Sequence, residues 1–533
     1  MRLSELLRAG RARMRLAGKT TERPAATPRL DPEDADSIGY NAAFSLASQL
    51  TSAVLTAVLT IFLVRALEPA EYGLFALALG INSILLLLAD FGISSSTARF
   101  IAERRRRPYV LGSLFVDALK LKLAVAGTAV GLVFVCAGLI ADAYGNDDLA
   151  WPLRGMALAV FGQSLVLLAF GVFTALGKIV IRYRLVLVES AVEVSASIAL
   201  VLLGGGVAGA AFGRAVGYLV GGVFGIVLVL RLVGGSGLSI SRRPSRETIR
   251  HVGRYASSLL VVDAAYTLSG SANVLLLAAY LDSVATAIYA APARLMIFLQ
   301  YPGLAIANAV GPRLAREEGQ EPNVAALASA VRALVFFQCL LLAPVIVWAE
   351  PIVDTVLGSD YGESADVLMA LSPYLLFSGL APVVTIGINY LGEARRRIPV
   401  ALLSLVLWVG SAMLLIPAHG PTGAAVAADV GIGFYTLAHL WICHRLLGLS
   451  LGRLGMSLVQ GLAAAAAMGA VLALFGTDSV GVISLLAGAL LGMLVYAAVL
   501  IAARAVTVDE LRRLPAALRR RPSAGEAPAR LAP

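Results

Sequence analysis

Hydrophobic residues along this chain occur in long, nearly continuous blocks rather than in alternation with polar residues. The block at 45–64, for example, is interrupted only by Ser, Thr and Gln. A hydrocarbon core of ~30 Å requires about 20 residues in a helix. Inside that core, the backbone polar groups must be satisfied without water. The pattern therefore predicts transmembrane helices.

Fourteen such blocks follow one another along the chain. The predicted fold is an all-α polytopic membrane protein whose approximate spans are 42–64, 72–94, 119–141, 152–176, 185–204, 208–230, 255–279, 284–309, 325–348, 366–391, 398–417, 421–443, 454–475 and 480–503.

The connections between these spans alternate in charge, as the positive-inside rule predicts. One set is basic and includes Arg104 to Arg107 and Arg395 to Arg397. The other set is poor in Lys and Arg and includes Glu68, Asp147 and Asp282. The alternation supports an even number of spans and places both termini in the cytoplasm.

An internal repeat divides the spans into groups. The sequence LVRALEPAEYGLFALALGI from Leu63 aligns without gaps with LAAYLDSVATAIYAAPARL from Leu277, at an offset of 214. Chance similarity between two apolar hairpins is the alternative. The offset places spans 1–6 over spans 7–12 in the same orientation, which predicts two six-helix lobes related by a pseudo-two-fold axis.

Two extra C-terminal helices follow these lobes. The predicted organisation is a basic cytoplasmic tail at 1–37, an N-lobe at 38–232, a cytoplasmic linker at 233–253, a C-lobe at 254–446, the last helix pair at 447–504 and a second basic tail at 505–533. The first tail either lies on the membrane surface as an amphipathic helix or is disordered.

Composition and charge exclude several classes of function. The chain is 59% hydrophobic and 14% charged, and its net charge of +10 comes mostly from residues that flank apolar blocks. No aromatic-interleaved basic patch points to nucleic acid. The three cysteines lie inside apolar blocks without metal-ligand spacing, so neither a disulfide, a metal site nor a cofactor is expected. Short external loops and four scattered histidines argue against an enzyme such as a glycan polymerase or ligase.

Several motifs resemble those of a known family. The stretch from Val64 to Phe75 (VRALEPAEYGLF) resembles the first-hairpin signature of the polysaccharide flippases, as do DFGISS from Asp90 and ARFIAE from Ala98. The run IYAAPARL from Ile288 is similar to the equivalent second-lobe segment. These are the O-antigen and exopolysaccharide transporters of the multidrug/oligosaccharidyl-lipid/polysaccharide exporter superfamily. The resemblance covers roughly residues 38–504, and the long basic N-terminal tail is not part of it.

The resemblance implies a flippase of the bacterial cytoplasmic membrane. It would move a polyprenyl-pyrophosphate-linked oligosaccharide outward by alternating access, for surface polysaccharide or lipopolysaccharide synthesis. We expect a monomer whose partners are the lipid-linked oligosaccharide and the bilayer, with polysaccharide polymerase or glycosyltransferase machinery as candidate partners. The alternative is a cation-coupled multidrug antiporter of the same superfamily.

Charged residues inside the spans are the candidate site residues because burial in lipid costs about 2.5–3.5 kcal/mol each on insertion scales. Arg294, near mid-membrane, is the first candidate for binding pyrophosphate or an acidic sugar, because its planar fork binds phosphate oxygens in pairs. Pairing with a neighbouring helix is the alternative. Arg214 either lines the same cavity or forms a structural bridge with Glu193. Arg65 is a further substrate-binding candidate, although it could instead reach the lipid headgroups.

Four carboxylates are candidates for carrying a coupling ion. Glu189 and Glu193 are four residues apart and therefore share one helix face. They would carry a proton or cation, or else neutralise Arg214, Lys120 or Lys122. Asp263 and Asp429 would bind a coupling ion at the lobe interface. Asp429 also lies in a run of small residues, where a packing role is the alternative.

Overall fold

The computed structural model describes residues 38–104, 108–233, 246–310, 324–391, 393–477 and 480–506. The two basic tails and most of the linker between the predicted lobes lie outside these ranges. Within them the chain is helical and contains no strand. The helices are α2 (Ile38–Ala66), α3 (Pro69–Asp90), α4 (Ile93–Arg104), α5 (Pro108–Ala143), α6 (Ala150–Ala175), α7 (Ile179–Leu200), α8 (Gly206–Val233), α9 (Arg246–Tyr280), α10 (Ser283–Phe298), α11 (Tyr301–Val310), α12 (Val324–Val347), α13 (Ala349–Val356), α14 (Ser364–Ala370), α15 (Ser372–Tyr390), α16 (Arg397–Leu447), α17 (Leu451–Ala473) and α18 (Val482–Ala502).

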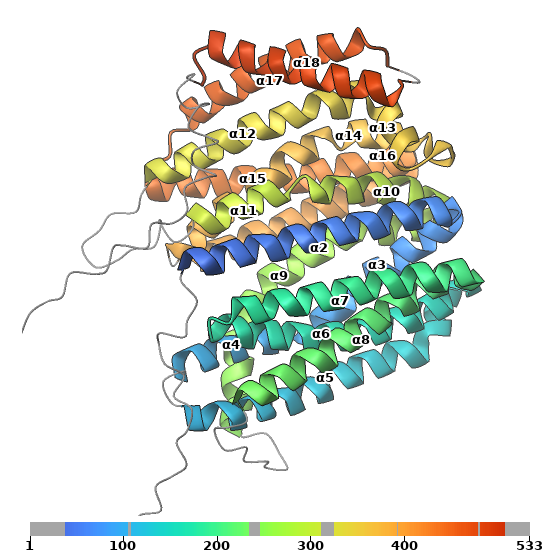
Figure 1. Ribbon diagram of the computed structural model, residues 1–533, viewed down its shortest axis with the longest axis vertical. Helices are drawn as coiled ribbons and strands as arrows, with labels where there is room; N and C mark the ends of the chain where they lie inside the picture. The colour runs from blue at the N-terminus through green and yellow to red at the C-terminus, as the bar shows by residue number, and fades with distance from the viewer. Residues whose placement is uncertain are drawn as a thin grey trace, which may run out of the picture.

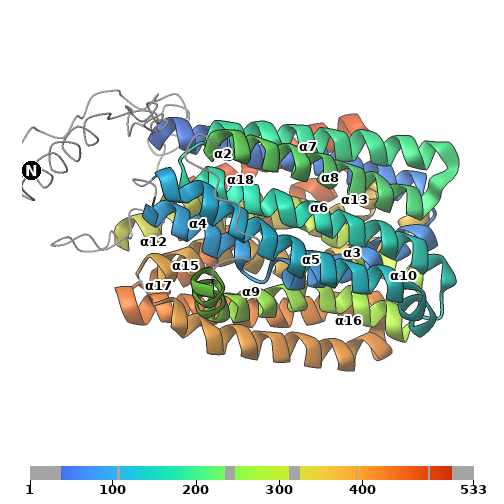
Figure 2. The ribbon, with the colours of Figure 1, turned by 90° about the horizontal axis from the view of Figure 1, so that it is seen from below.

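The long helices form a bundle in which their axes are roughly aligned (Figure 1, Figure 2). α17 and α18 form one edge of this bundle, and α5 lies at the opposite edge (Figure 1). Twelve stretches in the described ranges are long and apolar enough to cross a membrane. The all-α polytopic class predicted from the sequence is therefore confirmed.

Two of these twelve stretches are much longer than a bilayer requires, because each folds back on itself. The 55-residue stretch Ile179–Val233 reverses at Gly204 and Gly206, whose φ angles are 87° and 48°. The 51-residue helix α16 reverses at Gly420, with φ 59°. These are left-handed conformations that glycine adopts at little cost.

Contacts across the reversal confirm the antiparallel arrangement in α16. The hydroxyl of Ser404 donates a hydrogen bond to the carbonyl oxygen of Gly431 at 2.9 Å, whereas 27 residues of straight helix would separate the two by about 40 Å. Each long stretch thus contains two apolar helical arms. The number of fourteen crossings itself stays a prediction, since length and hydropathy alone distinguish twelve stretches.

Two predicted spans are each divided into two helices. The span expected at 284–309 consists of α10 and α11, and the span expected at 366–391 consists of α14 and α15. In both cases the second helix has proline at its second residue, Pro302 or Pro373. Proline fits the first turn of a helix but lacks the N–H that would continue the preceding one.

The glycines of α8 allow close packing inside the first half of the chain. A Cβ added at Gly213 would overlap the backbone of Ser197 in α7, and one at Gly217 would lie 2.5 Å from the Cβ of Glu193. On the other side of α8, Gly162 of α6 packs directly on the backbone of Tyr218. Small residues on both faces of α8 thus let the neighbouring backbones approach closely.

The last two helices lie on the outside of α12. Tyr496 of α18 donates a hydrogen bond to the carbonyl of Phe336 in α12 at 2.7 Å. Gly461 of α17 packs on Cys339 of α12, and the indole of Trp348 donates to the carbonyl of Gly476 at 3.1 Å. These contacts agree with an appended helix pair, although the division of the chain into lobes stays a prediction.

The packing of α8 on α7 gives a first testable prediction. Gly217→Val should destabilise the fold by about 1–3 kcal/mol, because the added methyl groups overlap Glu193. Its matched control is Gly131→Val in α5, where a Cβ would meet no atom within 4 Å. The apparent melting temperature of each purified variant in detergent measures the effect. Equal melting of the two variants would contradict the packing role.

Candidate functional site

A cavity of about 510 Å³ lies inside the bundle. Side chains from α3, α6, α8, α9, α10, α15 and α16 line it. This volume falls within the ~300–1,000 Å³ typical of small-ligand sites. α5, α17 and α18 contribute no side chain to its lining, so the cavity is separated from both edges of the bundle.

Charge on the cavity wall is entirely positive within the part of the chain that the structure describes. Arg214 of α8 and Arg294 of α10 both line the cavity, and no aspartate or glutamate is among its lining residues. The structure therefore brings together two of the three arginines that the sequence singled out. A partly buried site of this kind attracts anions, because a lower dielectric than that of water strengthens their interaction with a fixed cation.

Helix α10 directs Arg294 into the cavity. The helix begins at Asp282, whose carboxylate caps it by accepting a hydrogen bond from the N–H of Ala285 at 2.7 Å. Its cavity-facing residues include Ala290, Arg294 and Ile297, which are spaced by four and three residues and therefore share one face. The small side chain of Ala290 leaves space beside the guanidinium.

Arg294 makes no hydrogen bond or ion pair with any residue that the structure describes. Its electrostatic neighbours are Tyr72, Arg214, Tyr218 and Glu193. A guanidinium carries five donors, and in apolar surroundings such a cation requires compensation. Arg294 is consequently the cavity group most available to an anionic ligand.

Arg214 is already paired. It forms a buried ion pair with Glu193 of α7, and it also donates to the hydroxyl of Tyr218 at 3.3 Å. Its guanidinium carbon lies 4.8 Å from the centre of the Tyr218 ring. The sequence offered a bridge with Glu193 and a cavity position as alternatives, and the structure combines the two.

The remaining predicted site residues lie outside the cavity lining. Arg65 is exposed and donates to the carbonyls of Thr355 and Val356, at the C-terminal end of α13. Those last carbonyls have no intrahelical partner, so they attract a cation there. We therefore do not place Arg65 in the cavity site.

The four carboxylates proposed for ion coupling are not brought together. Glu189 packs on Gly221 of α8 and accepts a hydrogen bond from Ser190 at 3.4 Å, and Glu193 is the partner of Arg214. Asp263 interacts electrostatically with Arg397 and Asp90. Asp429 lies on a different helix.

Asp429 lies behind the cavity wall. It interacts with the backbone N–H of Tyr374 near the start of α15, and electrostatically with the Tyr289 side chain. The first amides of a helix favour a carboxylate. One of its oxygens, Oδ1, is buried without a hydrogen-bond partner among the described residues.

Aromatic and amide side chains complete the cavity, and the sequence analysis missed them. Tyr266, Tyr374 and Trp408 line it from α9, α15 and α16. Asn273 supports this wall: its amide donates to the Tyr289 hydroxyl at 2.8 Å and accepts from the Trp408 indole at 3.2 Å. Single aromatic residues inside apolar blocks carry no periodic signal that distinguishes a cavity face from a lipid face.

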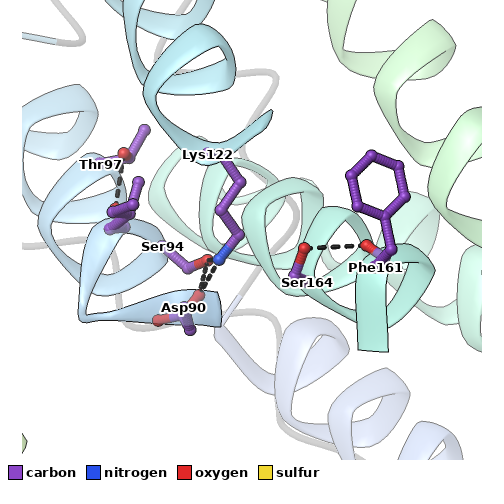
Figure 3. Close-up of polar contacts among 7 residues, drawn as sticks. Asp90, Ser94, Thr97, Lys122, Phe161 and Ser164 are labelled. Atoms are coloured by element: carbon purple, nitrogen blue, oxygen red, sulfur yellow. Dashed lines mark hydrogen bonds and ion pairs between the residues drawn. The ribbon is translucent and has the colours of Figure 1, made fainter. Parts of the chain in front are cut away.

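A second buried charge lies where α3 ends and α4 begins, beside the middle part of α5 (Figure 3). The Lys122 ammonium forms an ion pair with Asp90 and donates to the hydroxyl of Ser94 at 3.2 Å. Ser94 in turn donates to Asp90. Lys122 lies only three residues after the start of the predicted span 119–141, yet its side chain is 0% exposed. The reason is that α5 begins at Pro108, about three turns before the predicted span.

The sequence profile of the polysaccharide biosynthesis protein family matches residues 38–317, more than half of the chain. The chain belongs to this family. The resemblance noted in the sequence is thereby confirmed.

One curated relative extends the match across most of the chain. The protein described as "Probable low-salt glycan biosynthesis flippase Agl15" from Haloferax volcanii is 22% identical over 442 residues. The alignment covers 82% of this family member and 89% of the relative.

Solved structures share the fold at lower identity. "Lipid II flippase MurJ, inward closed conformation" aligns with a TM-score of 0.70 and 13% identity, covering 87% of this chain and 99% of that one. An inward-facing multidrug resistance MATE family transporter aligns with a TM-score of 0.61 and 16% identity, covering 75% and 95% respectively. Similarity at this identity supports the fold alone.

The ion pair of Figure 3 gives a second prediction. Lys122→Met should lower the free energy of unfolding by about 3–5 kcal/mol, because it leaves Asp90 without its counter-charge inside the protein. The double variant Lys122→Met with Asp90→Leu should recover most of this loss. Melting of the single and double variants in detergent forms the test cycle.

Arg396→Ala is the control for that cycle. Arg396 forms a solvent-exposed ion pair with Glu393, and the two side chains are 54% and 40% exposed. Loss of this pair should lower the free energy of unfolding by less than about 1 kcal/mol. If the double variant of Lys122 and Asp90 is destabilised by the sum of the two single-variant destabilisations, the two residues act independently and the ion pair makes no contribution.

Proposed function

We propose that this protein is a flippase that carries a polyprenyl-pyrophosphate-linked oligosaccharide across the cytoplasmic membrane for polysaccharide synthesis. The observation that carries the proposal is the cavity, with its unpaired Arg294, the paired Arg214 and no carboxylate among its described lining residues. A diphosphate is the anionic part of such a substrate, and a planar guanidinium binds its oxygens in pairs. Membership of the polysaccharide biosynthesis family supports the same substrate class.

The size of the cavity also favours a lipid-linked repeat unit. At about 510 Å³ the cavity holds many times the ~30 Å³ that one water occupies in the liquid. It is far too small for a polymer. A short oligosaccharide with its pyrophosphate fits this description, whereas the polyprenyl tail would remain in the bilayer.

A cation-coupled multidrug antiporter is the second candidate, and the similarity of fold to the MATE transporter favours it. Cationic drugs would need negative charge or bare aromatic rings in the cavity. The described lining supplies rings such as Tyr266 but places two arginines beside them. The positive wall therefore argues for the anionic, lipid-linked substrate.

The flippase is proposed to work by alternating access, with both termini in the cytoplasm and a monomer as the working unit. Coupling to an ion would use carboxylates outside the cavity. Asp429, with its unpartnered buried oxygen, and Asp263, placed between Asp90 and Arg397, are the candidates that geometry favours.

The role of Arg294 is tested by substitution. Arg294→Ala should lower the translocation rate of a lipid-linked oligosaccharide in proteoliposomes by about 10–100-fold, since charge-assisted hydrogen bonds contribute roughly 1.5–3 kcal/mol. Arg294→Lys should retain part of the activity, because it keeps the charge and loses the fork. The control is Arg445→Ala, which removes an exposed arginine beside Trp441. Full transport by a well-folded Arg294→Ala variant would refute the assignment.

Ion coupling is tested separately. Asp429→Asn and Asp263→Asn remove one charge each with little change of shape. If either carboxylate carries the coupling ion, its variant should lose the dependence of transport on a proton or sodium gradient across the vesicle membrane. Unchanged gradient dependence in both variants would place the coupling elsewhere.

A further inference from the structure

The cavity has a second chemical region, formed by aromatic rings and neutral amides, that binding of a pyrophosphate does not require. The two arginines come from α8 and α10, whereas Tyr266, Tyr374 and Trp408 come from α9, α15 and α16. The cavity wall thus combines a cationic set and an aromatic set of side chains that come from different helices.

The aromatic region is rigid. Trp408 is 5% exposed, its indole is fixed by Asn273, and the ring of Tyr374 packs edge-on against it with centroids 6.2 Å apart. The Tyr374 hydroxyl also accepts a hydrogen bond from Gln300 at 3.5 Å. Rings held in this way present a fixed surface, so a ligand pays little entropy to order them.

Tyr266 is the accessible member of the group. Its side chain is 50% exposed, although it lines the cavity and its ring lies 6.2 Å from that of Tyr435. Tyr266 and Tyr374 also interact electrostatically with each other. An accessible aromatic ring in a cavity offers an apolar face on which a ligand with an apolar face can stack.

Two amides in the lining lack partners. Asn82 of α3 is 4% exposed, and its oxygen Oδ1 has no hydrogen-bond partner among the described residues. The same holds for Oε1 of Gln163 in α6. A buried acceptor left unpaired costs about 1–3 kcal/mol. Both side chains line the cavity, so rotation of either amide would turn its buried oxygen toward a ligand that donates hydrogen bonds.

We propose that this region is a glycan subsite, distinct from the anion subsite at Arg294. Tyr266 and Tyr374 stack on the apolar C–H faces of sugar rings, and Asn82 and Gln163 accept hydrogen bonds from sugar hydroxyls. Sugars combine these two features, whereas a polyprenyl chain has no donors and a pyrophosphate has no apolar face. The proposal rests on the proposed function, because it assigns the sugar portion of the same substrate.

The test compares two lipids on purified protein in nanodiscs. The probes are undecaprenyl pyrophosphate and undecaprenyl pyrophosphate that carries a neutral trisaccharide. The wild-type protein should bind the glycan-bearing lipid more tightly. Tyr266→Leu and Tyr374→Leu should each reduce this preference roughly five- to tenfold. Their affinity for undecaprenyl pyrophosphate alone should be little changed.

Three control variants separate the possible causes. Tyr266→Phe keeps the ring and should keep most of the preference. Tyr280→Leu removes an exposed tyrosine of the same helix that does not line the cavity, and it should have no effect. Arg294→Ala should weaken the binding of both lipids equally and leave the ratio of the two affinities unchanged.

The outcomes distinguish the two proposals. A preference that is unchanged in both Tyr266→Leu and Tyr374→Leu would overturn the glycan subsite and leave the flippase proposal standing. So would a wild-type protein that binds both lipids equally well. If the wild-type protein binds neither lipid, the proposed function itself fails, and the subsite fails with it.

Discussion

An ionised side chain between apolar helices is stable only when another group compensates its charge, and this constraint organises the polar interior of the protein. Lys122 is compensated by Asp90 and Ser94, and Arg214 by Glu193. Each pair joins neighbouring helices and removes the desolvation penalty that either partner would bear alone. Arg294 breaks this rule within the described residues, and it does so where a cavity gives a ligand access. Its position agrees with the proposed role in binding an anion.

Close helix packing makes this arrangement possible. Gly217 lets α8 approach the backbone of α7 at Glu193, and the pair with Arg214 forms in the same region. Gly431 serves the second arm of α16 in a similar way, because a Cβ there would overlap the indole of Trp408. Small residues thus fix both the cationic and the aromatic parts of the cavity wall. A loosely packed bundle would allow these side chains several positions.

The sequence predicted the helical class and the reversals, because hydrophobic blocks follow strong physical rules. It also singled out Arg294 and Arg214 from the cost of burying charge, and the structure places both on the cavity wall. The roles of these two arginines stay predictions. The burial of Lys122 was not predicted, because hydropathy cannot reveal that α5 begins well before its apolar portion. The region around Tyr266 and Tyr374 was missed because an aromatic ring is equally compatible with lipid, core and cavity. Only the tertiary arrangement of α9, α15 and α16 makes that distinction.

The packing of α3 on α10 connects the site to a transport cycle. Gly73, near the start of α3, packs so tightly on the carbonyl of Ser283 that any Cβ there would overlap it. Close by, the rings of Tyr72 and Tyr361 lie edge to face with centroids 6.3 Å apart. In the proposed alternating-access cycle, opening the bundle at this end would require α3 and α10 to separate. Because α10 also carries Arg294, such a separation would move the unpaired cation relative to Arg214 on α8. Binding of an anion and opening of this end would then be coupled through a single helix.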